Sequence, residues 1–375
     1  MRKGTANAAV RGFTLIELMV GLVIGLLTVL VITQVMAMAE GKKRTTSMGN
    51  DAQVNGALAL FTMQRDIEQA GYGATANSAG LGCTVNAKNA SSAAFQFTLA
   101  PVVIAVGASN GPDTITILQG NTPGFSAPML LTGAHLQNDN HFAVSSSLGA
   151  VAGNMMIAVP QTVSSTNTCT LFNVTTDTSG TVTQLGNTNV PHVTGATGPW
   201  NPAAAQTQFP SSGYAAGDYL VNVGSMVLRA YTVDSANNLV VSDRSAIDGT
   251  VPSPPPEVYP QIVNLKALYG KDTNGDGVID AYDTTTPTTS AGWAQVQAIR
   301  IAVVARSAQF EKDAVTPTAP LWNVGGTITI AGSSACYTNS MCIPLQVSQV
   351  GTDWQHYRYK VYDTIVPLRN VLWSN

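Results

Sequence analysis

A short segment rich in oxygen-bearing side chains is the first place where this sequence could do chemistry. Residues 272–283 place acids and an amide at the spacing of a calcium-binding loop. The matching positions are Asp272, Asn274, Asp276, Val278 through its carbonyl oxygen, Asp280 and Asp283. Gly277 stands where such a loop turns sharply. Because hard oxygen ligands in this order can surround one cation, we expect calcium as a weakly bound cofactor.

Two features distinguish this loop from a helix–loop–helix calcium sensor. Asp283 stands where the standard loop has a glutamate that binds the ion with both oxygens, and its shorter side chain should weaken binding. The residues before the loop have the pattern of a strand, and residues 284–290 have that of a loop. We therefore expect an isolated loop with a dissociation constant of about 10⁻⁴ to 10⁻³ M. The alternative is a set of turns that side chains cap without metal.

The chain has four cysteines, an even number that fits disulfide bonding outside the cytoplasm. Cys336 and Cys342 enclose five residues and are expected to close a small loop, which leaves Cys83 and Cys169 as the second pair. All three pairings remain open in principle. A zinc site is the alternative, but no histidine lies at ligand spacing from either cysteine pair.

The composition and the scattered histidines argue against an enzyme or a nucleic-acid-binding protein. No serine, aspartate or cysteine near the four histidines forms a catalytic order, and no phosphate-binding glycine loop with a lysine is present. The formal net charge of −3 gives no basic field for nucleic acid. Only 10% of the residues are charged, which together with the cysteines favours export of the long C-terminal part. We expect no enzymatic activity.

The N-terminal segment carries a lone carboxylate at the start of an apolar run. Glu17 precedes about 22 residues, from Leu18 to Ala39, none of which is charged. As a helix this run would rise about 33 Å, enough to cross a hydrocarbon core of about 30 Å. A secretory signal peptide would have a shorter apolar centre with its cleavage site after it, whereas here the glycine junction at Gly12 comes first. We expect a membrane anchor behind a removable polar leader.

These residues resemble the N-terminus of type IV pilins, which share a basic leader, a glycine, a phenylalanine and then a glutamate. Gly12, Phe13 and Glu17 match that pattern. The resemblance implies that a prepilin peptidase cuts between Gly12 and Phe13 and methylates the new amine. It also implies that Glu17 meets the Phe13 amine of a neighbouring subunit in a filament, since a carboxylate near the membrane is costly without a partner. The alternative is an ordinary single-span anchor with Glu17 at the membrane interface.

The chain is expected to divide into a leader, a helix and a head. The boundaries are residues 1–12 for the leader, 13–70 for the helix with its anchor at about 13–39, and 71–375 for the head. No proline precedes Pro101, and Gly71 and Gly73 should end the helix. The residues expected on the face that packs on the head are Val54, Leu58 and Phe61, with Met63 or Ile67. Those expected on the polar face are Arg65, Asp66, Glu68 and Gln69.

Short apolar runs broken by Gly, Pro, Asn and Ser indicate that the rest of the chain is β structure and loops. The expected strands cover residues 113–118, 228–233, 239–241, 263–269, 299–303 and 357–362, the last of them half exposed. Residues 253–260 are expected to form a stiff polyproline connector. The fold class is therefore α+β and pilin-like, a long transmembrane and amphipathic helix packed on a large β-rich globular head.

Several later segments are similar to the large minor pilins called PilW. They are Ile67-Glu68-Gln69-Ala70-Gly71-Tyr72, Gly111-Pro112-Asp113-Thr114-Ile115-Thr116, residues 269–277, residues 296–307, and residues 359–370 ending in Pro367-Leu368-Arg369-Asn370. Residues from about 120 to 220 match no segment of that family. We expect that part to form a surface or a subdomain particular to this protein.

The resemblance implies a minor pilin that supports biogenesis of the type IV pilus and twitching motility from its tip or priming complex. Its implied partners are other minor pilins, the major pilin, the prepilin peptidase, the inner-membrane assembly platform and a large tip adhesin. Counting charges leaves the orientation nearly tied, because Arg2, Lys3 and Arg11 oppose Lys42, Lys43 and Arg44. Export of the cysteine-bearing part places the head in the periplasm before assembly, with one span in the inner membrane, and on the extracellular pilus afterwards.

Two other functions share part of this signature. A minor pseudopilin of a type II secretion system has the same N-terminal signal and builds a short periplasmic piston. A pilus-borne adhesin would use the middle region to bind a ligand in cell adhesion. Deleting the gene separates the minor pilin from the pseudopilin. Loss of pili supports the minor pilin, whereas loss of enzyme secretion with intact pili supports the pseudopilin.

Overall fold

The computed structural model describes residues 12–89, 94–122, 127–176, 185–193, 200–201, 208–243, 257–326 and 333–372, without the side chains of residues 44–51. The chain forms two units, residues 1–51 and residues 52–375. The predicted leader, apart from Gly12, lies outside the described residues, as do residues 253–256 of the predicted connector. Residues 257–260 form a strand, so this part of the connector prediction is wrong.

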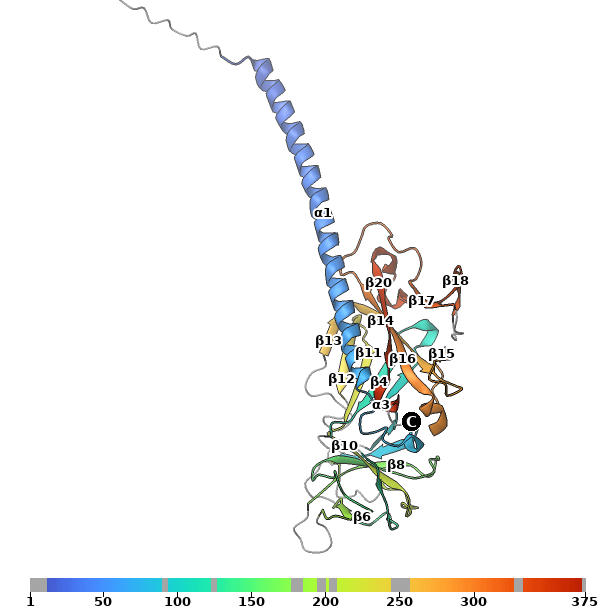
Figure 1. Ribbon diagram of the computed structural model, residues 1–375. Helices are drawn as coiled ribbons and strands as arrows, with labels where there is room; N and C mark the ends of the chain where they lie inside the picture. The colour runs from blue at the N-terminus through green and yellow to red at the C-terminus, as the bar shows by residue number, and fades with distance from the viewer. Residues whose placement is uncertain are drawn as a thin grey trace, which may run out of the picture. The chain divides into compact units, whose positions relative to one another are not determined.

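One helix, α1 (Leu15–Glu68), begins in the first unit and ends in the second. Its end fits the expected glycines, since Gly71 and Gly73 both have positive φ, at 78° and 76°. Within the second unit, α1 lies against the sheets that contain β11, β14 and β16 (Figure 1). The side chains that α1 buries there are Ala52, Gly56, Ala59, Met63, Asp66 and Ile67.

The buried face of α1 matches the predicted one only in part, since Met63 and Ile67 are buried as expected. Val54, Leu58 and Phe61 are exposed by 51% or more, while Asp66 is 2% exposed. Small residues decide which face can dock, because a Cβ at Gly56 would come within 2.6 Å of the Tyr362 ring and 3.1 Å of Ala305. The helix backbone approaches the sheet closely. The face of α1 that carries the small residues Ala52, Gly56 and Ala59 therefore docks, and the face that carries the bulkier Val54, Leu58 and Phe61 does not.

The helix packs on two antiparallel sheets that enclose the largest core. The five-stranded sheet has the order β13-β12-β11-β4-β3 and consists of β3 (Val102–Ala105), β4 (Thr114–Gln119), β11 (Val227–Val233), β12 (Asn238–Asp243) and β13 (Glu257–Pro260). The four-stranded sheet has the order β15-β14-β16-β20 and consists of β14 (Ile262–Lys271), β15 (Ala281–Asp283), β16 (Val296–Arg306) and β20 (Tyr359–Pro367). The expected strands are all present in these two sheets.

A three-stranded sheet covers the other face of the four-stranded sheet. It has the order β17-β19-β18 and consists of β17 (Leu321–Gly325), β18 (Ser334–Tyr337) and β19 (Ser340–Pro344). Trp322 and Ile343 pack there against Val263 and Val304. Strand β14 is therefore buried on both faces, which explains its nearly continuous apolar sequence.

The middle of the chain forms a further β subdomain with two cores of its own. Its six-stranded sheet has the order β2-β1-β8-β7-β10-β5 and consists of β1 (Thr84–Ala87), β2 (Phe95–Thr98), β5 (Met129–Leu130), β7 (Met155–Val159), β8 (Cys169–Asn173) and β10 (Tyr219–Gly224). Strands β6 (His141–Ala143) and β9 (Asn189–Pro191) pair beside it. This subdomain lies at the end of the head far from β20 and β17 in Figure 1.

Short helices complete the described chain. They are α2 (Ser290–Ala294), α3 (Arg369–Leu372) and the 3₁₀ turns Ser78–Gly80, Ala108–Asn110, Ser348–Val350 and Trp354–His356. α2 begins with the side chain of Thr289, which accepts a hydrogen bond from the Gly292 N–H. It places Trp293 in the core beside Tyr269.

Candidate functional site

The residues predicted to be processed and to assemble the filament lie together at the start of α1. Gly12 and Phe13 come just before the helix, and Phe13 is 89% exposed. The Thr14 N–H and Thr14 hydroxyl each donate to Glu17 Oε2 at 3.0 Å, and the Glu17 N–H donates to Thr14 Oγ1 at 3.3 Å. This reciprocal arrangement is a capping box. It holds the Glu17 carboxylate in the first helical turn, four residues after Phe13.

Thr14 was not among the predicted site residues, although the spacing Thr-x-x-Glu before an apolar run is a recognisable helix-start signal. Its role is local, because it supplies neutral donors to the carboxylate and fixes where the helix begins. The Glu17 carboxylate remains exposed in the described chain. A cationic amine from another subunit would therefore find an acceptor that is already oriented.

The helix that follows can cross a membrane by length and composition. The segment Leu15–Lys43 has 29 residues and a mean hydropathy of 2.8, and the described protein buries none of it. The hydroxyl of Thr28 donates to the Ile24 carbonyl, and that of Thr33 donates to the Leu30 carbonyl at 2.9 Å. Two of the few polar side chains in the span are thus satisfied within the helix, as a lipid environment requires.

The C-terminal end of α1 is fixed to the head by a buried carboxylate. Asp66 Oδ2 accepts hydrogen bonds from Arg229 Nη1 and from the Tyr231 hydroxyl, both at 2.5 Å. Burial, followed by the charge of Asp66, raises the pKa of Tyr231 well above its usual value, so this hydroxyl stays protonated and donates. Asp66 was predicted on the solvent face, and only the partners that β11 brings to it account for its burial.

Two segments that resemble PilW meet at the same helix end. The Asn370 side-chain amide donates to the Ala70 carbonyl at 2.9 Å and to the Gln69 carbonyl at 3.2 Å. Carbonyls at a helix end lack helical partners, so Asn370 acts as a cap supplied by the C-terminus of the chain. Residues 67–72 and 367–370 are therefore one structural unit.

The predicted calcium loop is closed by its own hydrogen bonds. Asp272 accepts from the N–H groups of Gly275 at 2.7 Å and Gly277 at 2.8 Å, and from Gln297 Nε2 at 2.7 Å. Burial raises the pKa of Asp272, but these donors outweigh it, so the pKa lies below its ordinary value. The side chain and backbone of Thr273 likewise hold the pKa of Asp280 below its usual range.

Three of the remaining predicted ligands are also engaged within the protein. Asp276 accepts from the Val278 N–H at 2.8 Å and Asn274 from the Asp276 N–H at 2.9 Å. Both oxygens of Asp283 accept from Lys271 Nζ, at 2.7 and 2.9 Å. In the described part of the chain, no three His, Cys, Asp or Glu side chains converge as metal ligands. The oxygen donors suit calcium, but an ion would have to replace these bonds and compete with Lys271 for Asp283.

The disulfide pairing is the one expected. Cys83 bonds Cys169 with a Cα–Cα distance of 6.0 Å, and Cys336 bonds Cys342 at 5.6 Å. The first bond links β1 to its parallel neighbour β8 inside the middle subdomain. The second links β18 to β19 within one hairpin.

Two histidines that looked unremarkable in the sequence meet in the core of the middle subdomain. The Nε2 atoms of His135 and His192 lie 2.7 Å apart among Phe142, Phe172 and Phe209. Burial lowers the pKa of His135 to about 4 and also holds the pKa of His192 well below its usual value. One neutral ring donates to the other, and nothing in this arrangement is open to a substrate.

Comparisons with known proteins agree with this geometry. Residues 230–370, from β11 to α3, match the family described as Type IV Pilus-assembly protein W. Residues 7–33 match the Prokaryotic N-terminal methylation motif, which spans Gly12, Phe13 and Glu17. Together, these two matches support a PilW-type minor pilin of the type IV pilin family. The match begins after the middle subdomain, which the family comparison leaves uncovered.

Two further comparisons add nothing to this assignment. A type IV-like pilin from Thermus thermophilus is similar at 13% sequence identity over 59% of this chain and 87% of that chain, with a TM-score of 0.21. No curated protein matches the chain.

As a pilin it assembles with other pilins, and its apolar N-terminal helix anchors it in a membrane.

Proposed function

We propose that this minor pilin is cut between Gly12 and Phe13 by a prepilin peptidase, methylated at Phe13, and assembled into the tip or priming complex of a type IV pilus. The observation that carries the proposal is the methylation motif immediately before an apolar helix that continues into a PilW-type head. Before assembly, α1 holds the protein in the inner membrane through a single span, with the head in the periplasm. The inner-membrane assembly platform then extracts it into the filament.

In the filament, Glu17 neutralises the Phe13 amine of a neighbouring subunit. The capping box supports this role, because Thr14 already orients the carboxylate with neutral donors. A charged amine forms a stronger hydrogen bond than these donors do. Thr14 therefore gives Glu17 an intramolecular partner while the protein is unassembled.

The size of the head supports a low-copy role. The unit of residues 52–375 is large for a subunit repeated at every step of a thin filament. A position at the tip removes this steric conflict and allows contact with other minor pilins and with a large tip adhesin. Abundance of this protein along the shaft would contradict the proposal.

The test is to shear surface filaments from the native cell and identify the N-terminal peptide of this protein by mass spectrometry. A methylated peptide beginning at Phe13 in the filament fraction is the expected result. The same peptide found only in the cell envelope, with enzyme secretion lost on deletion and pili intact, would support a type II secretion pseudopilin instead. Residues 1–12 still attached in both fractions would refute processing.

A further inference from the structure

The four-stranded sheet has two long strands at or near its edges, and the described residues cover only one of them. Strand β14 pairs with β15 only over Tyr269–Lys271. The rest of its outer edge is covered from within the chain. The Asp113 N–H donates to the Leu265 carbonyl at 2.7 Å, and the Gln349 side chain donates to the Val263 carbonyl at 2.7 Å.

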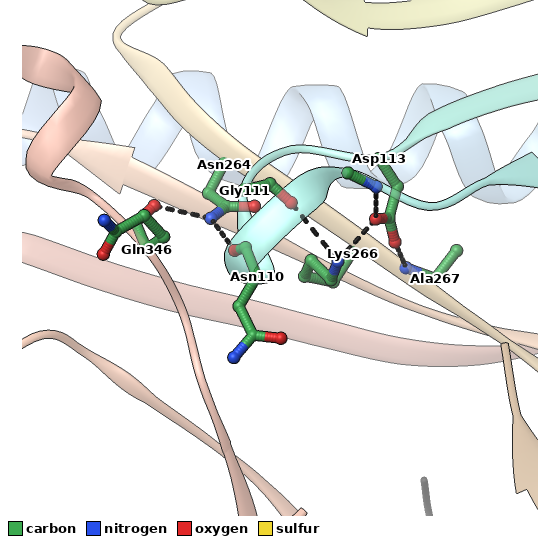
Figure 2. Close-up of polar contacts among 8 residues, drawn as sticks. Asn110, Gly111, Asp113, Asn264, Lys266, Ala267 and Gln346 are labelled. Carbon is green, nitrogen blue, oxygen red and sulfur yellow. Dashed lines mark hydrogen bonds and ion pairs between the residues drawn. The ribbon is translucent and has the colours of Figure 1, made fainter. Parts of the chain in front are cut away.

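Figure 2 shows how the chain fixes this cover. Asp113 accepts from the Ala267 N–H at 2.9 Å and pairs with Lys266 Nζ, which also donates to the Gly111 carbonyl at 3.2 Å. Both charged side chains are at most 5% exposed. Asn264 donates to the carbonyls of Asn110 and Gln346 beside them. The backbone groups of β14 that point away from β16 are thereby satisfied by other segments.

Strand β20 forms the opposite edge and has no such cover. Hydrogen bonds from the Ser307 N–H to the Arg358 carbonyl and from the Leu368 N–H to the Gln297 carbonyl lie at the two ends of its ladder with β16. In an antiparallel ladder, residues whose backbone groups bond to the neighbouring strand alternate with residues whose backbone groups point away from it. Arg358 and Leu368 are even-numbered and bond to the β16 side, so the odd-numbered residues of β20 point their backbone groups away from β16. The outward N–H groups belong to Tyr359, Val361, Asp363 and Ile365. No residue of the described chain bonds to them.

The length and regularity of β20 distinguish it from the other edge strands. It has nine residues paired in unbroken register with β16, whereas the other described strands at sheet edges have two to five. Short strands, bulges, lysine and proline are the usual protection of an edge against strand addition. β20 has no bulge and carries one lysine, and its proline stands at the last position.

We infer that the open edge of β20 is a strand-addition site for an extended segment of another pilus subunit. Main-chain hydrogen bonds to the four outward N–H groups would supply the binding, as in other sheet-augmentation contacts. Ile365, 48% exposed, calls for an apolar neighbour on the partner strand. Lys360 is exposed, with its ammonium 5.0 Å from the centre of the Tyr362 ring, and calls for an acidic neighbour.

A second copy of this chain fits the edge less well than another subunit does. The single acidic residue of β20, Asp363, is held by Arg300 Nη2 and Trp322 Nε1, each at 3.2 Å. Another β20 could therefore offer Lys360 only a carboxylate that already accepts from Arg300 and Trp322. The inference rests on the proposed function, because it assumes incorporation into the pilus.

The test exchanges Ile365 in the full-length protein in its native cell. Ile365→Pro removes one outward N–H and leaves the ladder to β16 intact, since proline is tolerated at an edge position whose N–H faces outward. Ile365→Val keeps the N–H and is the matched control. We expect wild type and Ile365→Val in sheared filaments, and Ile365→Pro there at a level at least tenfold lower with its envelope level unchanged within twofold. Lys360→Glu should also lower incorporation.

Hydrogen exchange keeps the inference testable if Ile365→Pro fails to fold. Wild-type protein is purified through an affinity tag, once in detergent and once from filaments. The four outward amides of β20 should exchange fast in detergent and be protected in filaments. Fast exchange of these amides in filaments, or normal incorporation of Ile365→Pro, would overturn the inference and leave the proposed function standing. Protection that arises from dimers of the purified protein would identify a second copy and overturn the assigned partner. Absence of wild type from filaments would overturn the inference and the proposed function together.

Discussion

At the scale of residues, the head contains two buried polar pairs that differ in how well they are satisfied. Asp113 and Lys266 each have backbone partners besides one another: Asp113 accepts from backbone N–H groups, and Lys266 donates to a backbone carbonyl. A buried ion pair needs such additional bonds to offset its loss of hydration. His135 and His192 have one hydrogen bond between them, and His135 Nδ1 is buried with no partner in the described protein. An unprotonated Nδ1 is cheaper to bury alone than an N–H, which favours His135 as the Nε2–H donor.

The histidine pair predicts a pH dependence of stability. Both rings are neutral in the fold, since burial depresses their pKa values, to about 4 for His135. The unfolded chain, with histidine near pKa 6.5, binds more protons below that pH. The free energy of unfolding should therefore fall as pH drops from 6.5 towards 4, by about 1.4 kcal/mol per pH unit for each ring.

Denaturant unfolding of the full-length protein in detergent between pH 7.5 and 4.5 measures this slope. The double variant His135→Phe/His192→Phe should flatten it, while His356→Gln, outside the pair, should leave it unchanged. Asp139 and His141 also act on His135, so each should remain in place in these variants. An equal slope in wild type and the double variant would refute the assignment.

The calcium loop gives a second prediction at this scale. With a dissociation constant of about 1 mM, 10 mM calcium would stabilise the fold by about 1.4 kcal/mol, which raises Tm by a few degrees at most. Asp276→Asn should abolish the rise, because it removes the charge of a calcium ligand whose hydrogen bonds among the described residues stay within the loop. Magnesium at the same concentration is the control. Identical melting in calcium and in EDTA would leave the self-capped loop as the correct interpretation.

At the scale of elements, α1 combines two chemically different helices. Its first part is apolar all round and unburied, whereas its second part has a narrow stripe of Ala, Gly and Met that docks and a bulky apolar stripe that does not. The docked stripe reaches the sheet closely enough for Gly56 to contact Tyr362. Hydrophobic size alone therefore does not identify the docking face.

Truncating one residue on each stripe tests this assignment. Met63→Ala should lower the free energy of unfolding of the head by about 2–5 kcal/mol, because Met63 is fully buried and leaves a cavity. Leu58→Ala, on the 51% exposed stripe, should change it by less than about 0.5 kcal/mol. Thermal and urea unfolding of the full-length protein in detergent provide the measurement. A larger loss for Leu58→Ala would show that Leu58 packs on the head, as the sequence predicted for it.

At the scale of the whole molecule, the head is a PilW-type core with a second β subdomain inserted between β4 and β11. Strands β5 to β10 belong to that insertion, and β1 and β2, from before β4, complete its sheet. The bond between Cys83 and Cys169 joins these two stretches of chain, which are 86 residues apart. It therefore restricts the unfolded chain far more than the hairpin disulfide does.

Removing each disulfide should reveal this difference. By chain entropy, Cys83→Ala/Cys169→Ala loses about 4–5 kcal/mol, whereas Cys336→Ala/Cys342→Ala, with a separation of six residues, loses about 2 kcal/mol. Thermal unfolding of both variants and of wild type gives the comparison. A larger effect of the hairpin disulfide would show that native strain or denatured-state structure outweighs chain entropy.

Local chemistry explains what could be predicted from the sequence. Most of the correct predictions depend on residues that are near one another in the sequence: the methylation motif, the apolar span, the glycine stop of α1 and the alternating strands. The cysteine pairs could be predicted because four cysteines allow only three pairings. The sequence-based prediction failed where long-range partners decide the outcome. Asp66 looked solvent-exposed because Arg229 and Tyr231 are about 165 residues away, and His135 and His192 are 57 residues apart.

The sequence by itself indicated a helix-anchored, pilin-like protein, because hydropathy, chain stiffness and a short recognition motif act over a few residues. The tertiary structure decided which stripe of α1 docks, which carboxylates are buried, and which sheet edge stays open. Those outcomes follow from the register between distant strands and from how closely two backbones can approach. Neither quantity is encoded in any single segment, so both emerge only when the segments pack together.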